Sequence, residues 1–240
     1  MREPILSVSN LHAGYGDLDV LFEITVDVVP GEWILFIGPN GSGKSTFLKV
    51  IGGLLKPKKG EILFNLLKPP TKERKNNTIG FLKQTNNIFP ALTVLENLEM
   101  ASFYSKNHEF DEYLELLFSI FPDLKGNKHK RAGLFSGGMR QKLAIGMVLA
   151  RRHKLLLLDE PTAGLAPHAA VEILIKIEEL KNELSKIEPL TIIMVEHNYR
   201  YVKDKVTRLI GMREGRIVID SNSPEDVVEN KEEMEKIFFG

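Results

Sequence analysis

A glycine-rich stretch near the start of the chain has the residue types and spacing that bind phosphate. The run Gly38-Pro39-Asn40-Gly41-Ser42-Gly43-Lys44-Ser45 fits the pattern of a glycine, four residues and then Gly-Lys-Ser/Thr. Glycines let successive backbone N–H groups turn toward phosphate oxygens, the lysine can reach the β- and γ-phosphates, and the Ser45 hydroxyl can bind Mg²⁺. A glycine-rich turn that only caps a helix is the alternative for this motif taken alone.

Two adjacent acids follow a short apolar run later in the chain. Leu155–Leu158 leads directly into Asp159 and Glu160. Acids at the carboxyl end of a buried parallel strand face the edge where such sheets bind ligands. We expect Asp159 to hold Mg²⁺, largely through its water shell, and Glu160 to polarise the water that attacks the terminal phosphate. An acidic pair before a proline, here Pro161, also begins many ordinary turns. The presence of the phosphate loop in the same chain is what favours a catalytic role for the pair.

A third candidate is the segment Ser136-Gly137-Gly138, which precedes a run with helical spacing. Serine is a common N-cap, and the two glycines allow an anion to approach the positive end of the helix closely. An ordinary capped helix explains this segment equally well when it is taken in isolation. Its value depends on the other motifs.

Strands that alternate with helices are predicted to position these residues. Residues 45–48 begin a helix after the phosphate loop, residues 91–153 have helical spacing, and a further helix is expected between Val195 and Arg216. The predicted strands are Ile5–Val8, Ile24–Val29, Trp33–Ile37, Thr78–Leu82, Leu155–Leu158, Thr191–Val195 and Arg216–Ile219, with an amphipathic helix over Ala169–Leu184. This alternation predicts an α/β fold with a parallel sheet.

One continuous domain is expected over residues 1–240. Residues 5–36 and 60–82 should form a β-rich subdomain together with core strands, residues 86–153 an inserted helical lobe, and residues 154–240 the rest of the core. The sequence has no repeat, low-complexity tract or long Gly/Ser linker that would divide it.

The composition excludes several classes of function. Thirty-two Lys and Arg balance 32 Asp and Glu, so the chain has no bulk attraction for nucleic acid, and we expect no nucleic-acid partner. The absence of cysteine excludes disulfides, a cysteine-based zinc site and a thiol nucleophile. No apolar run approaches the roughly 20 residues of a membrane-spanning helix, so a role at a membrane requires a partner.

The motifs as an ordered set resemble those of the ATP-binding-cassette (ABC) ATPases. The set consists of the phosphate loop, Gln84, Ser136-Gly137-Gly138, Asp159-Glu160 and His197. The resemblance covers nearly the whole chain. It implies a P-loop NTPase core with a mainly parallel sheet, an N-terminal antiparallel β subdomain and an inserted helical subdomain.

The resemblance also implies roles for individual residues. Gly38–Thr46 would bind ATP, Gln84 would contact Mg²⁺ and the attacking water, and Ser136-Gly137-Gly138 would be the signature segment. Asp159 and Glu160 would be the second magnesium-binding motif and the catalytic base, and His197 the switch histidine near the γ-phosphate. Tyr15 matches the aromatic residue that stacks on adenine, with a turn tyrosine packed on the core as the alternative.

In this family two ATPases face each other head to tail, and each ATP lies between the phosphate loop of one and the signature of the other. ATP-driven closure and reopening after hydrolysis are therefore expected. The implied partners are transporter membrane subunits, bound at the cytoplasmic face of the cell membrane, and a second ATPase that is either identical or related. A partly apolar, exposed groove near Phe89 and Leu92 is the expected docking place for a membrane subunit.

Finer features resemble the ATPases of branched-chain amino acid and related amide importers. They are Ala163–Pro167, with Pro167 where the wider family commonly has Asp, together with Ile120–Lys125, Arg131–Gly133 and the ending Phe238-Phe239-Gly240. Phe135 and Met139 depart from the usual signature, whose Ser-Gly-Gly core is intact.

Two other functions compete with a transporter motor. A soluble ABC ATPase acting in DNA repair or translation usually has a long coiled-coil insertion, zinc-binding cysteines or two cassettes in one chain, and none of these is present. A nucleotide sensor without hydrolysis would most simply lack Glu160, which is present. The cargo cannot be read from this sequence.

Overall fold

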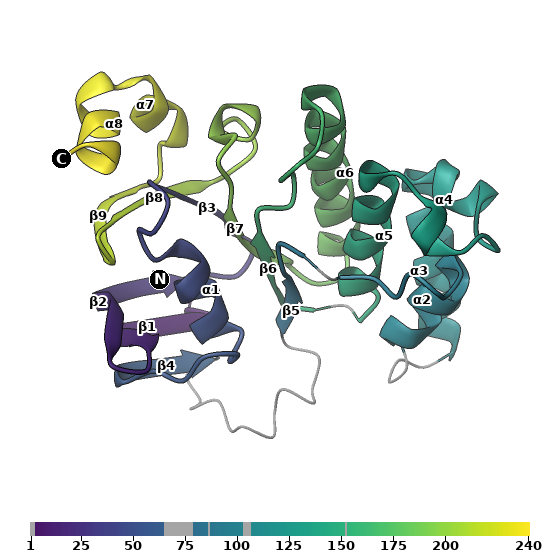
Figure 1. The fold of residues 1–240 in the computed structure, drawn as a ribbon, viewed down its shortest axis with the longest axis horizontal. Helices are drawn as coiled ribbons and strands as arrows, with labels where there is room; N and C mark the ends of the chain where they lie inside the picture. The colour runs from purple at the N-terminus through teal and green to yellow at the C-terminus, as the bar shows by residue number, and fades with distance from the viewer. Residues whose placement is uncertain (1–2, 65–78, 86, 103–106, 152) are drawn as a thin grey trace.

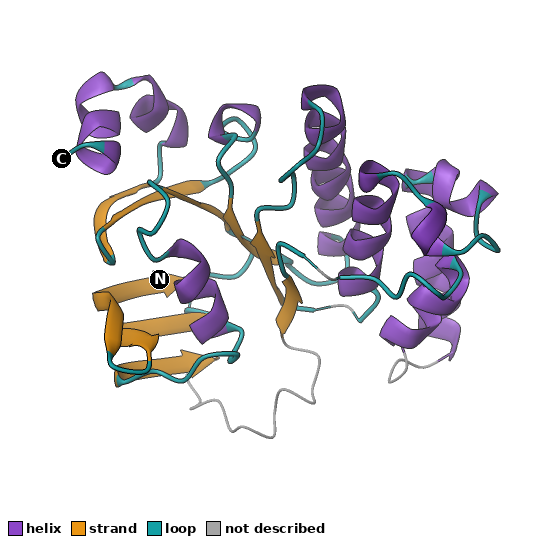
Figure 2. Ribbon diagram, viewed as in Figure 1, coloured by secondary structure: helices purple, strands orange, loops and turns teal. Residues whose placement is uncertain are grey.

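The computed structural model describes residues 3–64, 79–85, 87–102, 107–151 and 153–240 (Figure 1). It is an α/β structure in which the strands lie on one side and in the centre, and most of the helices lie on the other side (Figure 2). Three strands form an antiparallel sheet in the order β2-β1-β4, with bounds Leu18–Val28, Leu6–Tyr15 and Lys59–Phe64. This sheet confirms the expected antiparallel β subdomain.

A second sheet has six strands in the order β5-β6-β7-β3-β8-β9. Their bounds are Ile79–Leu82, Leu155–Asp159, Thr191–Val195, Trp33–Ile37, Arg208–Arg213 and Arg216–Ser221. All neighbouring pairs are parallel except β8 and β9. The carboxyl ends of β3, β6 and β7 therefore adjoin at one edge, and the candidate chemistry follows these three strands.

The central strands are buried on both faces, and their alternating side chains feed two separate cores. In β3, Trp33, Leu35 and Ile37 pack with the helical side, whereas Ile34 and Phe36 pack with the antiparallel sheet. Burial on both faces explains why these strands are apolar throughout rather than alternating with polar residues. The sheet is thus fixed in register by hydrophobic contacts on each side.

Helix α1, Lys44–Ile51, starts directly at the phosphate loop and packs against strands of both sheets. The helical lobe contains α2 (Val94–Ser102), α3 (Asn107–Ile120), α4 (Pro122–Gly126) and α5 (Gly137–Leu149), with a 3-10 turn at Ala132–Leu134. Helix α6 (Pro167–Ser185) follows β6. A second 3-10 turn spans Tyr199–Tyr201, and α7 (Pro224–Glu229) and α8 (Lys231–Phe238) end the chain beside β8 and β9 (Figure 1).

Three local predictions differ from the structure, and one of them is strand β2, which begins at Leu18 rather than at the predicted Ile24. The helix expected between Val195 and Arg216 is wrong, because this segment holds only the 3-10 turn and strand β8. Glycine is unfavourable in strands, so Gly211 weakens the sequence signal of β8. The structure needs glycine here because a Cβ would lie 2.6 Å from the Ile237 side chain of α8. Strand β1 runs past the predicted Ile5–Val8, because irregular pairing around Asn10 breaks the period-2 pattern. The first residue of the predicted strand Thr78–Leu82 lies outside the described residues.

Candidate functional site

The phosphate loop connects β3 to α1 and depends on glycine at two tight positions. Gly38 has φ 146°, and a Cβ there would lie 2.0 Å from the backbone oxygen of Met212. Gly43 has φ 101°, and a Cβ there would meet the Leu21 side chain at 2.7 Å. Only glycine fits these positions without moving the backbone. Asn40 and Gly41 are exposed at the tip of the loop, so its backbone is accessible to a ligand.

Lys44 lies folded against the loop from which it comes. Its side chain is buried, and Nζ donates to the backbone oxygens of Gly38 and Pro39, each at 2.9 Å, and to Ser42 Oγ at 3.2 Å. Burial lowers the pKa of Lys44, and the nearby charges of Glu160 and Asp159 oppose that shift. A cation held at the loop by carbonyl oxygens is placed to attract an anionic ligand. Thr46 is buried in the first turn of α1.

Ser45 and Asp159 meet at the carboxyl edge of the sheet. Ser45 Oγ donates to Asp159 Oδ1 at 2.7 Å, and Asp159 is only 5% exposed. Burial raises the pKa of Asp159 and the charge of Glu160 adds to this, while the hydrogen bond from Ser45 lowers it. Among the described residues, no group of three or more acidic, histidine or cysteine side chains could hold a metal by itself. One hydroxyl and one carboxylate are a donor set that suits Mg²⁺ when water and phosphate supply the other ligands.

Glu160 joins two segments that are far apart in the sequence. Gln84 Nε2 donates to Glu160 Oε2 at 2.8 Å, and His197 Nε2 lies 2.9 Å from Glu160 Oε1. Glu160 has a left-handed backbone, φ 51°, which is uncommon for a non-glycine residue, and its N–H donates to Val195 O at 2.9 Å. This backbone conformation turns the carboxylate away from the strand direction, toward Gln84 and His197.

Glu196 supports this arrangement and was missed by the sequence reasoning. Its carboxylate is 2% exposed; Oε2 accepts from Thr162 Oγ1 at 2.7 Å and Thr162 N at 3.3 Å. Oε1 accepts from the N–H groups of His197 and Asn198, at 2.8 and 3.1 Å. Glu196 therefore fastens the turn that carries His197 to the turn after Glu160. A charged residue at the end of the apolar strand Thr191–Val195 was the available signal.

Tyr15 ends strand β1 and is 45% exposed. Its hydroxyl lies 3.4 Å from Lys49 Nζ, and Lys49 is 5.7 Å from the ring centroid, so the tyrosine lies beside helix α1. The ring is not packed into the core, which argues against the alternative of a core-packed turn tyrosine. An exposed ring near the helix that follows the phosphate loop is available for stacking.

Ser136, Gly137 and Gly138 lie elsewhere, at the start of α5 in the helical lobe (Figure 1). Ser136 is exposed and caps the helix, with Met139 N donating to its Oγ at 3.4 Å. Within the described residues no hydrogen bond joins this segment to the phosphate loop. The structure brings together Lys44, Ser45, Gln84, Asp159, Glu160 and His197, but not the signature segment.

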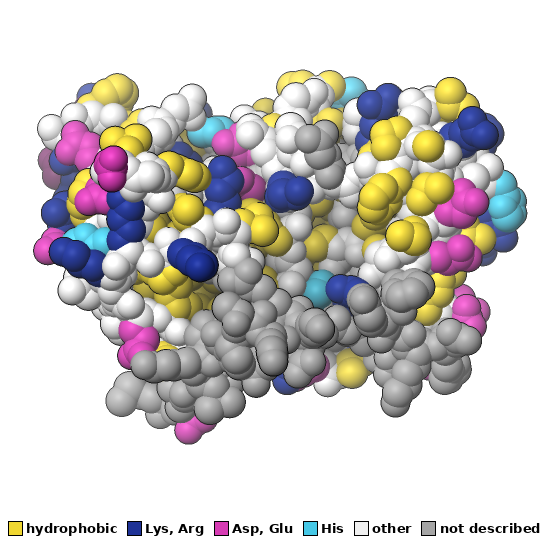
Figure 3. Space-filling model, turned by 60° about the horizontal axis from the view of Figure 1, so that its bottom comes forward, with side chains coloured by type: hydrophobic (Ala, Val, Ile, Leu, Met, Phe, Trp, Pro, Cys, Tyr) yellow, Lys and Arg dark blue, Asp and Glu magenta, His cyan; other side chains and the backbone are white. Residues whose placement is uncertain are grey.

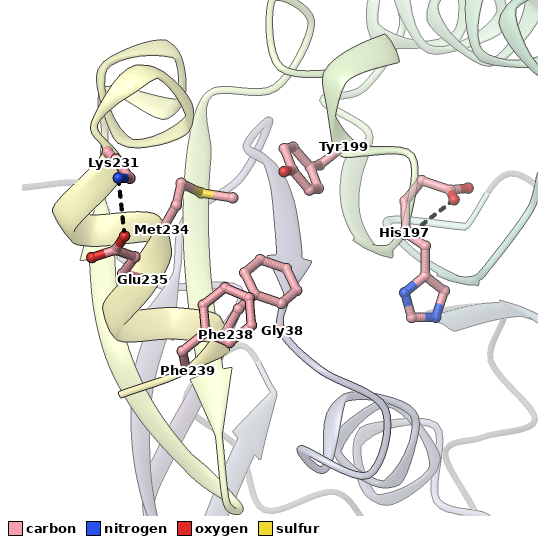
Figure 4. Close-up of a pocket in the computed structure, with 9 residues that line it drawn as sticks. Gly38, His197, Tyr199, Lys231, Met234, Glu235, Phe238 and Phe239 are labelled. Carbon is pink, nitrogen blue, oxygen red and sulfur yellow. Dashed lines mark hydrogen bonds and ion pairs between the residues drawn. The ribbon is translucent and has the colours of Figure 1, made fainter.

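A cavity of about 420 Å³ opens beside the site, between α8 and the loop after β7 (Figure 4). Phe238 and Met234 come from α8 and Tyr199 from the loop, and Gly38 and His197 also line the cavity. Tyr15 and Lys44 are not among its lining residues. The cavity therefore adjoins the phosphate loop without including the exposed tyrosine.

Apolar side chains are exposed on the helical lobe, over which hydrophobic side chains gather in Figure 3. Phe89 is 50% exposed and Leu134 is 80% exposed, whereas Leu92 is half-buried. Backbone bonds from Gly133 N to Pro90 O and from Ala132 N to Leu92 O, each 2.9 Å, hold these two segments together. Apolar side chains near Phe89 are thus open to solvent, and the expected groove stays a prediction. Among the described residues, no helix is long and apolar enough to span a bilayer.

Comparisons with known sequences agree with the geometry. A family model described as ABC transporter matches residues 21–163. A probable branched-chain amino acid transport ATP-binding protein, LivF of Archaeoglobus fulgidus, is 35% identical and covers 98% of this chain and 99% of its own length. The high-affinity branched-chain amino acid transport ATP-binding protein BraG of Pseudomonas aeruginosa is 34% identical over 90% of this chain and 91% of its own length.

Solved structures give the same result. CbiO1 of Clostridium perfringens, part of the ABC transporter complex cbiONQ, has a TM-score of 0.82 at 29% identity, covering 97% of this chain and 93% of its own. A dimeric, post-hydrolysis structure of the ATP-binding cassette MJ0796 with ADP and phosphate has a TM-score of 0.77 at 26% identity, covering 91% and 98%.

Proposed function

The chain belongs to the ABC transporter family as an ATP-binding, ATP-hydrolysing subunit, and from this premise we propose that two copies close around two shared Mg-ATP sites to drive import of a small solute. The observation that carries the chemistry is the contact of Glu160 with both Gln84 and His197, next to the Ser45–Asp159 pair. A base, two residues that orient it and a phosphate loop are the parts that phosphoryl transfer to water requires.

The phosphate loop is proposed to bind ATP through its backbone N–H groups and Lys44. The N-terminus of α1 adds its dipole at the same place. Tyr15 is proposed to stack on the adenine ring, because it is exposed beside α1. Stacking selects a planar ring rather than a particular base, so adenine specificity is not assigned to this residue.

Ser45 and Asp159 are proposed to hold Mg²⁺, with Gln84 as a further ligand. When bound there, Mg²⁺ would neutralise charge that develops on the phosphate oxygens. Asp159 needs such a cation electrostatically, because it is a buried carboxylate with another acid next to it. The raised pKa of Asp159 reflects the unfavourable free energy of a negative charge that is buried before the cation binds.

Glu160 is proposed to be the general base. Among the described residues, each of its oxygens has one side-chain partner, which leaves lone pairs to accept a proton from an attacking water. Gln84 and His197 orient the carboxylate, and Glu196 fixes the position of His197 from behind. Removal of a positioned base typically slows hydrolysis by about 10²–10⁴-fold.

The signature segment is proposed to act on the ATP of the partner subunit. Its capped, exposed helix start in the helical lobe is suited to an anion that comes from outside this chain. The dimeric cassette to which this chain is similar supports a two-subunit arrangement. Closure with ATP and reopening after hydrolysis would then drive the cycle.

The exposed surface around Phe89 and Leu134 is proposed to receive a transporter membrane subunit at the cytoplasmic face. Half to four-fifths of these apolar side chains face solvent, a pattern typical of an interaction surface rather than a core. Relatives named for branched-chain amino acid transport support an amino acid or similar small solute as the imported cargo. The relatives give no support to a soluble ATPase acting in DNA repair or translation.

The test of this proposal is the Glu160→Gln variant. We expect ATP binding within about twofold of the unmodified chain and hydrolysis slower by about 10²–10⁴-fold. Glu214→Gln is a matched control, because Glu214 is an exposed glutamate that also has a left-handed backbone, φ 48°, but lies in the β8–β9 turn. Normal turnover by Glu160→Gln would remove Glu160 from the role of base.

A further inference from the structure

A fully buried amide lies beneath the exposed turn of the helical lobe. Asn97, in helix α2, is 0% exposed. Its Oδ1 accepts from Phe89 N at 2.7 Å, and its Nδ2 donates to Phe89 O at 3.0 Å. Nδ2 also lies within bonding distance of Thr93 O at 2.8 Å and Leu92 O at 3.3 Å. Both ends of the amide are therefore used, and every bond goes to the backbone of residues 89–93.

The apolar side chains of this turn are only partly buried. Phe89 is half exposed and Leu92 is half-buried. The backbone of the turn is closed by Leu92 N donating to Phe89 O at 3.1 Å, and Gly133 N donates to Pro90 O at 2.9 Å. Hydrogen bonds from Asn97 and Gly133 to the backbone of the turn therefore fix the orientation of an apolar surface that faces solvent.

A second asparagine makes the same kind of contact at the other end of this segment. Asn87 Oδ1 accepts from Lys83 N at 3.1 Å, and its Nδ2 donates to Lys83 O. Lys83 directly precedes Gln84, whose side chain bonds to Glu160. Asn87 thus bonds to the backbone N–H and C=O of Lys83, and Asn97 bonds to the same two groups of Phe89.

We propose that Asn97 is a positioning residue that holds the docking turn, residues 89–92, on helix α2, so that a membrane subunit seated on Phe89 is coupled to the segment that carries Gln84. This inference rests on the proposed docking surface. Asparagine is required because the site needs one acceptor and a donor that serves several carbonyl oxygens. Aspartate would place a second oxygen against those carbonyls, and alanine would leave the partly buried Phe89 N–H without this partner.

The contacts of Asn97 with the docking turn are separate from the contacts that support basal ATP hydrolysis. Gln84 keeps its own supports, Asn87 through Lys83 and the bond to Glu160, when Asn97 is changed. Loss of Asn97 should therefore loosen the docking turn and leave the nucleotide site intact. A residue with a merely structural role would instead lower ATP affinity and basal hydrolysis together with the stimulated activity.

The test compares Asn97→Ala and Asn97→Asp with Ser102→Ala. Ser102 is a matched control, because it is also a buried polar residue of α2, and within the described part of the chain its hydroxyl bonds to Glu99 O of the same helix. In the isolated chain we expect ATP Kd and basal kcat of the Asn97 variants to stay within about twofold. Hydrogen exchange at the Phe89 amide should rise at least tenfold, with no change at the amides of β6.

The functional readout uses the complete transporter, purified with its membrane subunits and placed in lipid vesicles. We expect the Asn97 variants to lose at least tenfold of the cargo-stimulated hydrolysis and of transport, Asn97→Asp no less than Asn97→Ala, while Ser102→Ala remains normal. Normal stimulation with Asn97→Ala, or an equal loss of basal hydrolysis, would overturn the inference.

A Phe89→Ser variant separates this inference from the docking proposal. If Phe89→Ser reduces stimulation and Asn97→Ala does not, the docking surface stands and the role of Asn97 is wrong. If Phe89→Ser leaves stimulation normal, the docking proposal is wrong and the positioning role fails with it. Because the chain has no cysteine, Ala91→Cys gives a single spin-label site whose mobility should increase in Asn97→Ala alone.

Discussion

Glu196→Gln tests whether a buried carboxylate connects the turn of Glu160 to the turn of His197. The carboxylate accepts four hydrogen bonds, two on each oxygen. Glutamine keeps one oxygen, and the turn amides of His197 and Asn198 can both still donate to it. The new NH₂ group then faces Thr162, whose hydroxyl can rotate to accept, but whose backbone N–H loses its acceptor.

The magnitude follows from these contacts. One buried N–H without a partner costs about 1–3 kcal/mol, and the remaining bonds lose the strengthening that a charged acceptor gives. We therefore expect a loss of about 2–3 kcal/mol in the free energy of unfolding. For a chain of this length, that corresponds to a fall of roughly 4–12 °C in Tm.

Catalysis should fall as well, because the two turns carry the proposed base, Glu160, and its partner His197. A displacement of a catalytic group by about 1 Å can cost around 100-fold, so we expect kcat to fall by about 10- to 100-fold at temperatures where the variant is folded. Chemical denaturation and steady-state ATPase assays measure the two effects. Thr162→Ser, which keeps the hydroxyl, is the matched control. Unchanged stability together with unchanged kcat would refute the role assigned to Glu196.

Three further predictions concern nucleotide binding. Asp159→Asn should raise Tm at pH 7 while hydrolysis falls. Because burial raises the pKa of Asp159 in the fold, its charge lowers stability only as pH rises above the ordinary value of 3.8, and the gain in Tm should vanish below that pH. Tyr15→Ala should weaken ATP binding in calorimetry by about 3- to 10-fold and Tyr15→Phe should not, since stacking contributes roughly 0.5–1.5 kcal/mol; equal affinities would contradict stacking. Gly38→Ala should abolish ATP binding because its Cβ would lie 2.0 Å from Met212 O, whereas Gly41→Ala, with open space but φ 81°, should cost only about 1 kcal/mol of stability; similar effects on ATP binding would contradict the tight approach at Gly38.

Much of the fold could be predicted because the parallel strands are short apolar runs with clear ends. Strand β7 has the predicted bounds, and the runs that become β3 and β6 lead directly into the phosphate loop and Asp159. Strand β8 was not predicted because Gly211 interrupts it and arginines stand at both ends. Its place between β3 and β9 is set by tertiary contacts, which leave no periodic signal in the sequence.

The site, like the fold, has residues that a local motif identifies and residues that only tertiary contacts identify. Motif spacing identified residues next to the phosphate loop, whereas Glu196 and Asn97 belong to no such motif. Their importance comes from burial with several backbone partners, and burial of a polar residue cannot be read from one sequence. An exposed apolar surface near Phe89 was predicted through family resemblance, but the buried asparagine that bonds to the Phe89 backbone was not.

The most direct test of the shared-site proposal is the molar mass of the Glu160→Gln chain, measured by light scattering after size exclusion, with and without Mg-ATP. We expect a change from one chain of 27.1 kDa to a dimer only with Mg-ATP. Adding Ser136→Arg to this variant should prevent the dimer, because Ser136 would face the partner's nucleotide. A single-chain mass with ATP demonstrably bound, or a dimer that forms equally well with Ser136→Arg, would contradict the shared-site proposal.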